Sequence, residues 1–134
     1  MNLLCRLTVA SAFFALLPTV QAFGQEFGIG SMDRSSHLSF EGGAQIYYGV
    51  CQGCHMKDAS GARGAGVYPA LSHNAKLAES GYPISVILHG QKAMPALGGM
   101  FSDQQIAEVI NYVRQNFGNS YRDVVTPANV KAAR

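Results

Sequence analysis

The sequence predicts an all-α fold in which a few helices are joined by long loops. Residues 102–118 have the clearest helical pattern, because Ser102 and Gln105 have the spacing of a capping box. The apolar side chains of this segment recur at helical spacing: Ile106, Val109, Ile110, Val113 and Phe117. Residues 57–72 and 91–100 are rich in glycine and proline and show no hairpin signal or alternating strand. We therefore expect helices and loops without a sheet.

Length and composition allow one domain that folds around a core. The chain has 134 residues, of which 48% are hydrophobic and only 13% charged, and this balance excludes disorder driven by charge. Ten basic against eight acidic residues give a formal net charge of +2. That bias is too small for a nucleic-acid-binding surface. Because the chain has no tryptophan, we expect something other than a large aromatic core at its centre.

Residues 1–22 have the pattern of a secretory signal peptide: an early arginine, an apolar run and small residues before Ala22. Such a peptide directs export and is then removed, here by cleavage after Ala22 or Gly24. We therefore expect a periplasmic protein. The apolar run is shorter than the roughly 20 residues that span a bilayer. This disfavours an uncleaved anchor and predicts no stable membrane insertion after cleavage. Residues 23–38 have no sustained period and are interpreted as a flexible leader.

The domain itself is expected over residues 39–118, followed by a C-terminal extension over residues 119–134. Helical segments are predicted over residues 39–50, 74–79, 83–89 and 102–118. Gly43 weakens the first helix, which indicates that another helix approaches closely at this position. Pro83 fits the first position of its helix, where a missing N–H costs nothing, and Gly90 ends that helix.

One motif indicates a specific chemistry, the C-x-x-C-H pattern of Cys51, Cys54 and His55. On one helical turn, two thiols can reach the two vinyl groups of one porphyrin and form thioethers, while the histidine ligates the iron. The motif therefore predicts one covalently bound haem c per chain, which would also occupy the centre of the fold. A redox dithiol would need a βαβ context and a zinc ribbon would need a second cysteine pair, and the sequence has neither.

The second axial ligand is expected to be Met94, because a thioether suits a low-spin haem and raises its potential. Met94 precedes a proline in the loop before the last helix. Met100 is the main alternative, although we expect it to pack beneath the start of that helix, and a histidine such as His89 is the other. A ligating histidine needs its second ring nitrogen satisfied, and the Pro69 carbonyl is the candidate partner for His55.

These motifs resemble the class I cytochromes c over residues 39–118. The residues that carry the resemblance are Gly43, Tyr47 and Cys51 at four-residue spacing, the C-x-x-C-H motif, Pro69-x-Leu71 and Met94-Pro95. The resemblance implies a small fold whose first and last helices cross beside the haem, with Gly43 and Tyr47 against Ile110 or Tyr112. The run from Asn111 to Arg114 is similar, more specifically, to the haem domains and subunits that serve periplasmic dehydrogenases.

The expected function is one-electron transfer through an iron that cycles between Fe(III) and Fe(II). The leading hypothesis is a periplasmic carrier that takes electrons from a dehydrogenase and passes them to a terminal oxidase or another acceptor. It would not be an enzyme, because His55 and Met94 account for both axial positions. The alternatives are a dedicated cytochrome subunit of one dehydrogenase complex and an open-site haem enzyme such as a peroxidase.

Covalent attachment gives the first testable prediction. We expect acidified acetone to leave the haem with the denatured protein, in a ratio of one haem to one chain, because the chain has a single C-x-x-C-H motif. The haem absorbance of the pellet and of the acetone phase measures both quantities. Haem that passes freely into the acetone would contradict the predicted thioether bonds.

Overall fold

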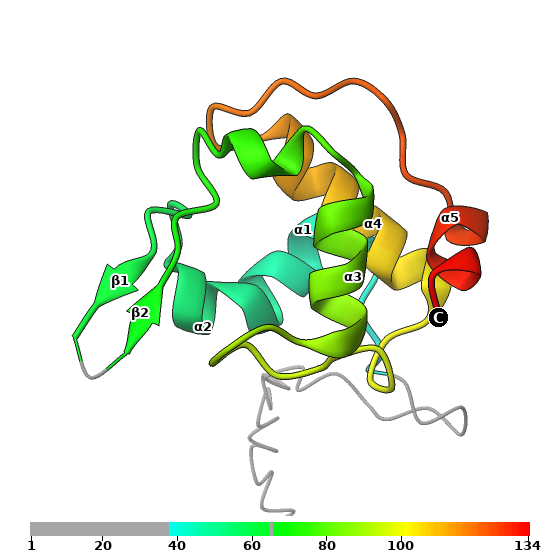
Figure 1. Ribbon diagram of the computed structural model, residues 1–134, viewed down its shortest axis with the longest axis horizontal. Coiled ribbons are helices and arrows are strands. Elements are labelled where there is room, and N and C mark those ends of the chain that lie inside the picture. Colours follow the sequence, from blue (N-terminus) through cyan, green and yellow to red (C-terminus); the bar gives the residue numbers. More distant parts are fainter. Residues whose placement is uncertain (1–37, 65) are drawn as a thin grey trace, which may run out of the picture.

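The computed structural model describes residues 38–64 and 66–134 and shows a mostly helical fold (Figure 1). The predicted signal peptide and nearly all of the predicted leader lie outside the described residues. The elements follow in the order α1 (Gly42–Ile46), η1 (Tyr47–Cys51), α2 (Gln52–His55), β1 (Ala62–Arg63), β2 (Val67–Tyr68), η2 (Ala75–Leu77), α3 (Gly81–His89), α4 (Asp103–Gln115) and α5 (Pro127–Ala132). Within the described part of the chain, no helix has the length and apolar character needed to cross a membrane.

The first three elements form one unbroken helical segment from Gly42 to His55. The linking residues Tyr47 and Cys51 are themselves helical, and the middle element is a turn of π-helix. Met56, with a φ of 68°, ends the segment directly after His55. Both cysteines and the histidine of the C-x-x-C-H motif therefore lie on a single helical element.

One prediction about the fold is wrong, because the loop over residues 57–72 contains a short antiparallel hairpin. β1 pairs with β2 so that Ala62 lies opposite Tyr68, and the Gly64 N–H donates to the Gly66 carbonyl oxygen at 2.9 Å. Strands of two residues are too short to show an alternating pattern in a sequence. The predicted all-α class is otherwise confirmed in the described residues.

The boundaries of α3 and α4 differ slightly from the prediction. α3 begins at Gly81, so Pro83 is the third residue of the helix and still lies in the first turn, where an N–H has no partner inside the helix. α4 begins with its predicted capping box but ends at Gln115. Phe117 and Gly118 have φ values of 57° and 78° and turn the chain away from the helix axis.

The core is built on the apolar face of α4. The predicted side chains of this face are at most 7% exposed: Ile106, Val109, Ile110 and Val113. α1 contributes Ile46 to the same cluster, and α3 contributes Ile84 and Leu88. Fully burying one such side chain stabilises a fold by roughly 1.5–3 kcal/mol. α4 is therefore the element on which the other helices assemble.

α1 crosses α4 at close range through Gly43. A Cβ atom at this position would overlap the Glu108 carbonyl oxygen and lie 2.7 Å from the Tyr112 Cβ atom, so only hydrogen fits. Beside the crossing, the centroid of the Tyr47 ring lies 5.8 Å from that of Tyr112 and 4.7 Å from that of Phe117. The structure confirms the expected contact of Gly43 and Tyr47 with Tyr112.

Residues 119–134, the C-terminal segment, return along α4 and end in α5 (Figure 1). Arg114 is 0% exposed and anchors this segment. Its guanidinium donates to the carbonyl oxygens of Leu77 and Ala78 and pairs with Asp123 at 2.7 Å. The hydrogen bond from Arg114 holds the pKa of the Asp123 carboxyl below its usual range. One buried cation therefore joins η2, α4 and the C-terminal segment.

Adding one methyl group tests the helix crossing. We expect Gly43→Ala to destabilise the fold by about 1–3 kcal/mol, because the new Cβ atom meets the Glu108 backbone. Alanine is intrinsically a better helix former than glycine. A loss of stability would therefore come from the close contact between the helices and not from helix propensity. Gly81→Ala is the control, since Gly81 is also helical and a Cβ atom there meets nothing within 4 Å. Denaturant unfolding measures both variants, and equal stability would show that the crossing tolerates a side chain.

Candidate haem site

Cys51 and Cys54 lie one turn apart on the first helical segment, at the end of η1 and within α2. Both are free thiols, and Cys51 is half-buried whereas Cys54 is exposed. Residues three apart on a helix are neighbours on its surface. The two sulfur atoms can therefore serve one planar group that lies against this part of the helix, as two thioether bonds to a single porphyrin require.

His55 is the last residue of α2 and is buried, with 8% of its surface exposed. Its Nδ1 atom lies 2.9 Å from the Pro69 carbonyl oxygen, the partner predicted from the sequence. A carbonyl oxygen only accepts hydrogen bonds, so Nδ1 carries the proton and Nε2 keeps its lone pair. This tautomer can bind a metal ion through Nε2, and the hydrogen bond at Nδ1 increases its basicity.

The turns beside the hairpin bring the Pro69 carbonyl to His55. The Gly61 N–H donates to the His55 carbonyl oxygen at 3.0 Å, and the Leu71 N–H donates to the carbonyl oxygen of the buried Ala59 at 2.8 Å. The chain is therefore fixed on both sides of Pro69. The histidine ring is oriented by backbone groups whose own positions are held by hydrogen bonds.

The residue after the histidine is held in an unusual conformation. Met56 has a φ of 68° and a ψ of 160°, a combination that residues other than glycine rarely adopt. The Tyr47 hydroxyl donates to the Met56 carbonyl oxygen at 2.7 Å. Burial raises the pKa of Tyr47 to about 12, so this phenol remains a proton donor at neutral pH. The helix crossing that encloses Tyr47 thereby also fixes the point at which the chain leaves the motif.

The thiol chemistry does not favour the two rival assignments of the cysteines. Burial raises the pKa of the Cys51 thiol to about 11, whereas redox dithiols work through a lowered thiolate pKa. A zinc site made of protein ligands needs several of them close together. Residues 38–64 and 66–134 contain no group of three or more His, Cys, Asp or Glu placed to hold a metal ion. Thioether formation remains the chemistry that the two thiols fit.

Met94 lies in the loop over residues 91–101, the Met94 loop, and is half-buried there. Its N–H donates to the Gln91 carbonyl oxygen and its carbonyl oxygen accepts from the Gln91 N–H, both at 3.0 Å. The expected position of Met100 is wrong, because Met100 is 42% exposed instead of packing beneath the start of α4. The neighbouring Phe101, at 2% exposure, is the buried side chain just before α4.

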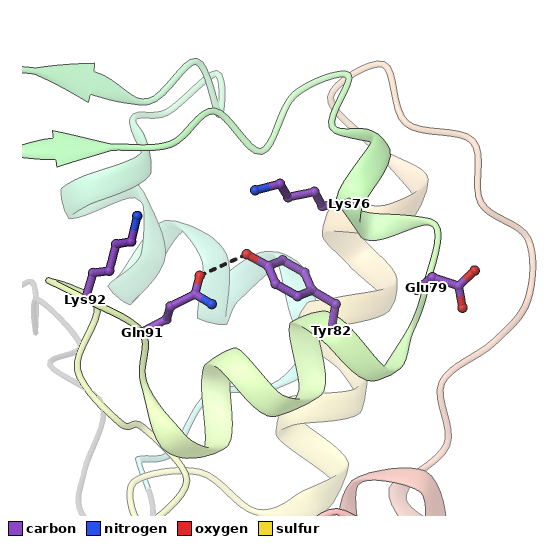
Figure 2. A pocket seen from close by; sticks show the side chains of 5 residues that line it. All are labelled: Lys76, Glu79, Tyr82, Gln91 and Lys92. Carbon is purple, nitrogen blue, oxygen red and sulfur yellow. Dashed lines mark hydrogen bonds between the residues drawn. The ribbon is translucent and has the colours of Figure 1, made fainter.

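A shallow cavity that is wide open to solvent is lined by Lys76, Glu79, Tyr82, Gln91 and Lys92 (Figure 2). Figure 2 shows the side chains converging on this space, except that of Glu79, which points away. The Tyr82 hydroxyl donates to Gln91 Oε1 at 2.9 Å. Two ammonium groups and a phenol suit an anionic group such as the carboxylates of a haem. Sequence reasoning missed these residues because they come from η2, α3 and the Met94 loop and form no motif.

The class of protein follows from the C-x-x-C-H motif, whose buried His55 ring engages the Pro69 carbonyl through Nδ1 and whose two free thiols lie one helical turn apart. This fold and this site are those of a c-type cytochrome. Residues 39–113 match the family described as cytochrome c oxidase, cbb3-type, subunit III, and the chain belongs to this family. The resemblance to the cytochromes c is thereby confirmed, and with it a haem c cofactor and electron transfer as the class of function.

Several similar proteins are named as cytochromes. The cytochrome c subunit of alcohol dehydrogenase (quinone) from Gluconacetobacter polyoxogenes is 32% identical over 117 residues, covering 78% of this chain and 25% of that subunit. The gluconate 2-dehydrogenase cytochrome c subunit from Pantoea cypripedii is 31% identical over 106 residues, covering 69% and 24%. Cytochrome c6 from Diacronema lutheri is 30% identical over 78 residues, covering 57% and 94%. The chain thus spans about a quarter of the length of the dehydrogenase subunits.

Proposed function

We propose that this chain is a one-electron carrier of the periplasm, with one haem held by thioethers to Cys51 and Cys54 and with His55 and Met94 on its iron. The observation that carries the proposal is the His55 ring, which is buried and engages the Pro69 carbonyl through Nδ1, so that Nε2 is left for iron. When bound, the haem supplies the Fe(III)/Fe(II) couple. The single C-x-x-C-H motif supports one haem per chain.

Met94 is proposed as the second axial ligand because its backbone is fixed by two hydrogen bonds and its side chain is half-buried. The alternatives are less well placed. Met100 is exposed, and the His89 Nε2 atom lies 3.2 Å from the Ala133 carbonyl oxygen, to which it donates. Iron with two protein ligands has no open position, so this arrangement favours electron transfer over reaction with a bound substrate.

The signal peptide proposed for residues 1–22 would bring the carrier to the periplasm. There it would accept electrons from a dehydrogenase and deliver them to a terminal oxidase or another acceptor. We place the docking surface on the exposed, uncharged part of the Met94 loop, at Ala93, Pro95 and Ala96, because electron-transfer encounters need only a small contact. The second candidate function is a dedicated subunit of one dehydrogenase. It is favoured by the relatives that are named cytochrome subunits of such enzymes.

Replacing Met94 tests two proposals together: that Met94 is the second axial ligand, and that the iron has no open coordination position. We expect the oxidised protein to show a methionine-to-iron absorption near the red edge of the visible spectrum, and the reduced protein not to bind carbon monoxide rapidly. Met94→Ala should abolish that absorption, lower the midpoint potential and admit carbon monoxide, because the soft thioether that favours Fe(II) is lost. Met100→Ala is the matched control, since Met100 is exposed and belongs to the same loop.

The opposite pattern, in which Met100→Ala removes the absorption and Met94→Ala keeps it, would show that Met94 is not the ligand. Rapid carbon monoxide binding by the unmodified protein, or turnover of peroxide at enzyme-like rates, would favour the open-site haem enzyme instead.

Electron uptake tests the partner and the docking surface. We add the purified protein to a periplasmic extract supplied with an alcohol or sugar substrate and expect the haem absorbance to show that the protein is reduced. On a sizing column, we expect the protein to elute alone. Ala96→Gln should slow this reduction without moving the midpoint potential, because it places a polar side chain on the docking surface. Ala44→Gln, at an exposed position of α1, is the control. Equal rates for the two variants would place docking elsewhere, and co-elution with a dehydrogenase would favour the dedicated subunit.

A further inference from the structure

The side chain of Arg134 connects the C-terminal segment to the Met94 loop. Its Nη1 atom donates to the Gly98 carbonyl oxygen at 2.7 Å, its Nη2 atom donates to the Phe101 carbonyl oxygen at 3.1 Å, and its Nε atom pairs with Asp103 at 2.6 Å. The side chains of Arg134 and Asp103 are 37% and 27% exposed. A planar guanidinium donates its hydrogen bonds in fixed directions. Arg134 therefore fixes the relative positions of its three partners in addition to pairing with a carboxylate.

The two carbonyl groups that Arg134 contacts belong to the part of the Met94 loop that packs on α3. The Leu97 N–H donates to the Ile87 carbonyl oxygen at 2.8 Å. Gly98 is buried, and a Cβ atom there would lie 2.9 Å from the Leu88 carbonyl oxygen. The loop is thus held between the end of α3 on one side and Arg134 on the other.

Arg134 is held in position by the elements before it. Asn111 on α4 exchanges two hydrogen bonds with the Val125 backbone, at 2.8 and 2.9 Å. The Thr126 side chain caps α5, and Val130 on α5 is 0% exposed. Figure 1 shows α5 beside α4, with the chain end close to the loop that enters α4. The C-terminal segment therefore presents Arg134 to the Met94 loop from a packed helix.

We propose that the C-terminal segment acts as a latch on the Met94 loop, with Arg134 as a positioning residue that keeps the loop closed on α3 and thereby retains the Met94 sulfur on the iron. The proposal rests on the proposed function for its effect on the iron, whereas the contact with the loop stands without it. Phe101 anchors one end of the Met94 loop in the core, but residues 91–100 add only the partly buried Leu97 to it. A segment with so few buried apolar side chains opens more readily than the helices around it, so an added clamp changes how often the ligand is released.

Hydrogen exchange tests the latch without reference to the haem ligand. In the holoprotein, we expect Arg134→Gln to raise the exchange rates of the Leu97 and Met100 amides about tenfold, which corresponds to the net loss of about one hydrogen bond from a partly exposed guanidinium. Both amides donate within the structure, to the Ile87 and Leu97 carbonyl oxygens. Arg122→Gln removes the same charge at an exposed position of the C-terminal segment and should leave these rates unchanged.

Exchange that rises equally in the Met94 loop and along α4 would show that Arg134 supports the fold in general and would overturn the latch. So would equal loop exchange in the Arg134→Gln and Arg122→Gln variants.

A second measurement follows the ligand itself. During denaturant titration of Arg134→Gln, we expect the methionine-to-iron absorption to disappear at a lower concentration than the helical ellipticity. In the unmodified protein and in Arg122→Gln the two signals should disappear together. Coincident loss in Arg134→Gln would overturn the effect on the ligand. If the unmodified protein lacks the absorption, the Met94 assignment fails, and the exchange rates alone decide whether the latch exists.

Discussion

The close crossing of α1 and α4 is the constraint on which the rest of the structure depends. With only hydrogen at Gly43, the helices approach until the Tyr47 ring packs against Tyr112. The hydroxyl of this ring donates to the Met56 carbonyl oxygen at the end of its own helical segment. The same helical segment continues to His55, so its position against α4 also decides where the proposed iron ligand lies. A change at the crossing is therefore transmitted to the site through a rigid helix, without direct contact.

The two proposed axial ligands are held by different kinds of interaction. His55 belongs to a helix that packs against the core, where each buried side chain contributes roughly 1.5–3 kcal/mol. Met94 belongs to a loop that is anchored in the core at one end by Phe101 and is otherwise held by backbone hydrogen bonds and by Arg134, and such bonds contribute about 0.5–1.5 kcal/mol each. An electron carrier gains from this packing because a fixed coordination shell has little to rearrange when the charge of the iron changes.

Features that follow from residue type and spacing or from the family resemblance could be predicted, whereas contacts that neither of these indicates could not. The capping box of α4, its apolar face and the Pro69 partner of His55 are confirmed, since each follows from residue type and spacing. The sequence does not indicate the hairpin because its strands are too short for a pattern. It predicts a helix that reaches Phe117 because an apolar residue at helical spacing can also serve packing beyond a helix end. The cavity beside Tyr82 and the contacts of Arg134 join separate elements and leave no local signal. The haem-binding roles of the cysteines, His55 and Met94 remain predictions.

The burial of Arg114 shows that the end of the family match and the end of the packed structure are different residues. The region shared with the family ends at residue 113, one residue before a guanidinium that is 0% exposed. The charge of this arginine is compensated by Asp123 and by the Leu77 and Ala78 carbonyl oxygens, and a buried cation deprived of its counter-charge is strongly destabilising. A chain cut at residue 113 would lose Arg114 and the end of α4, whereas a chain cut after α4, at Gln115, would keep the cation and lose its carboxylate. A unit that keeps the whole of α4 therefore has to extend to Asp123 if this charge is to stay compensated, which is beyond the end of the family match.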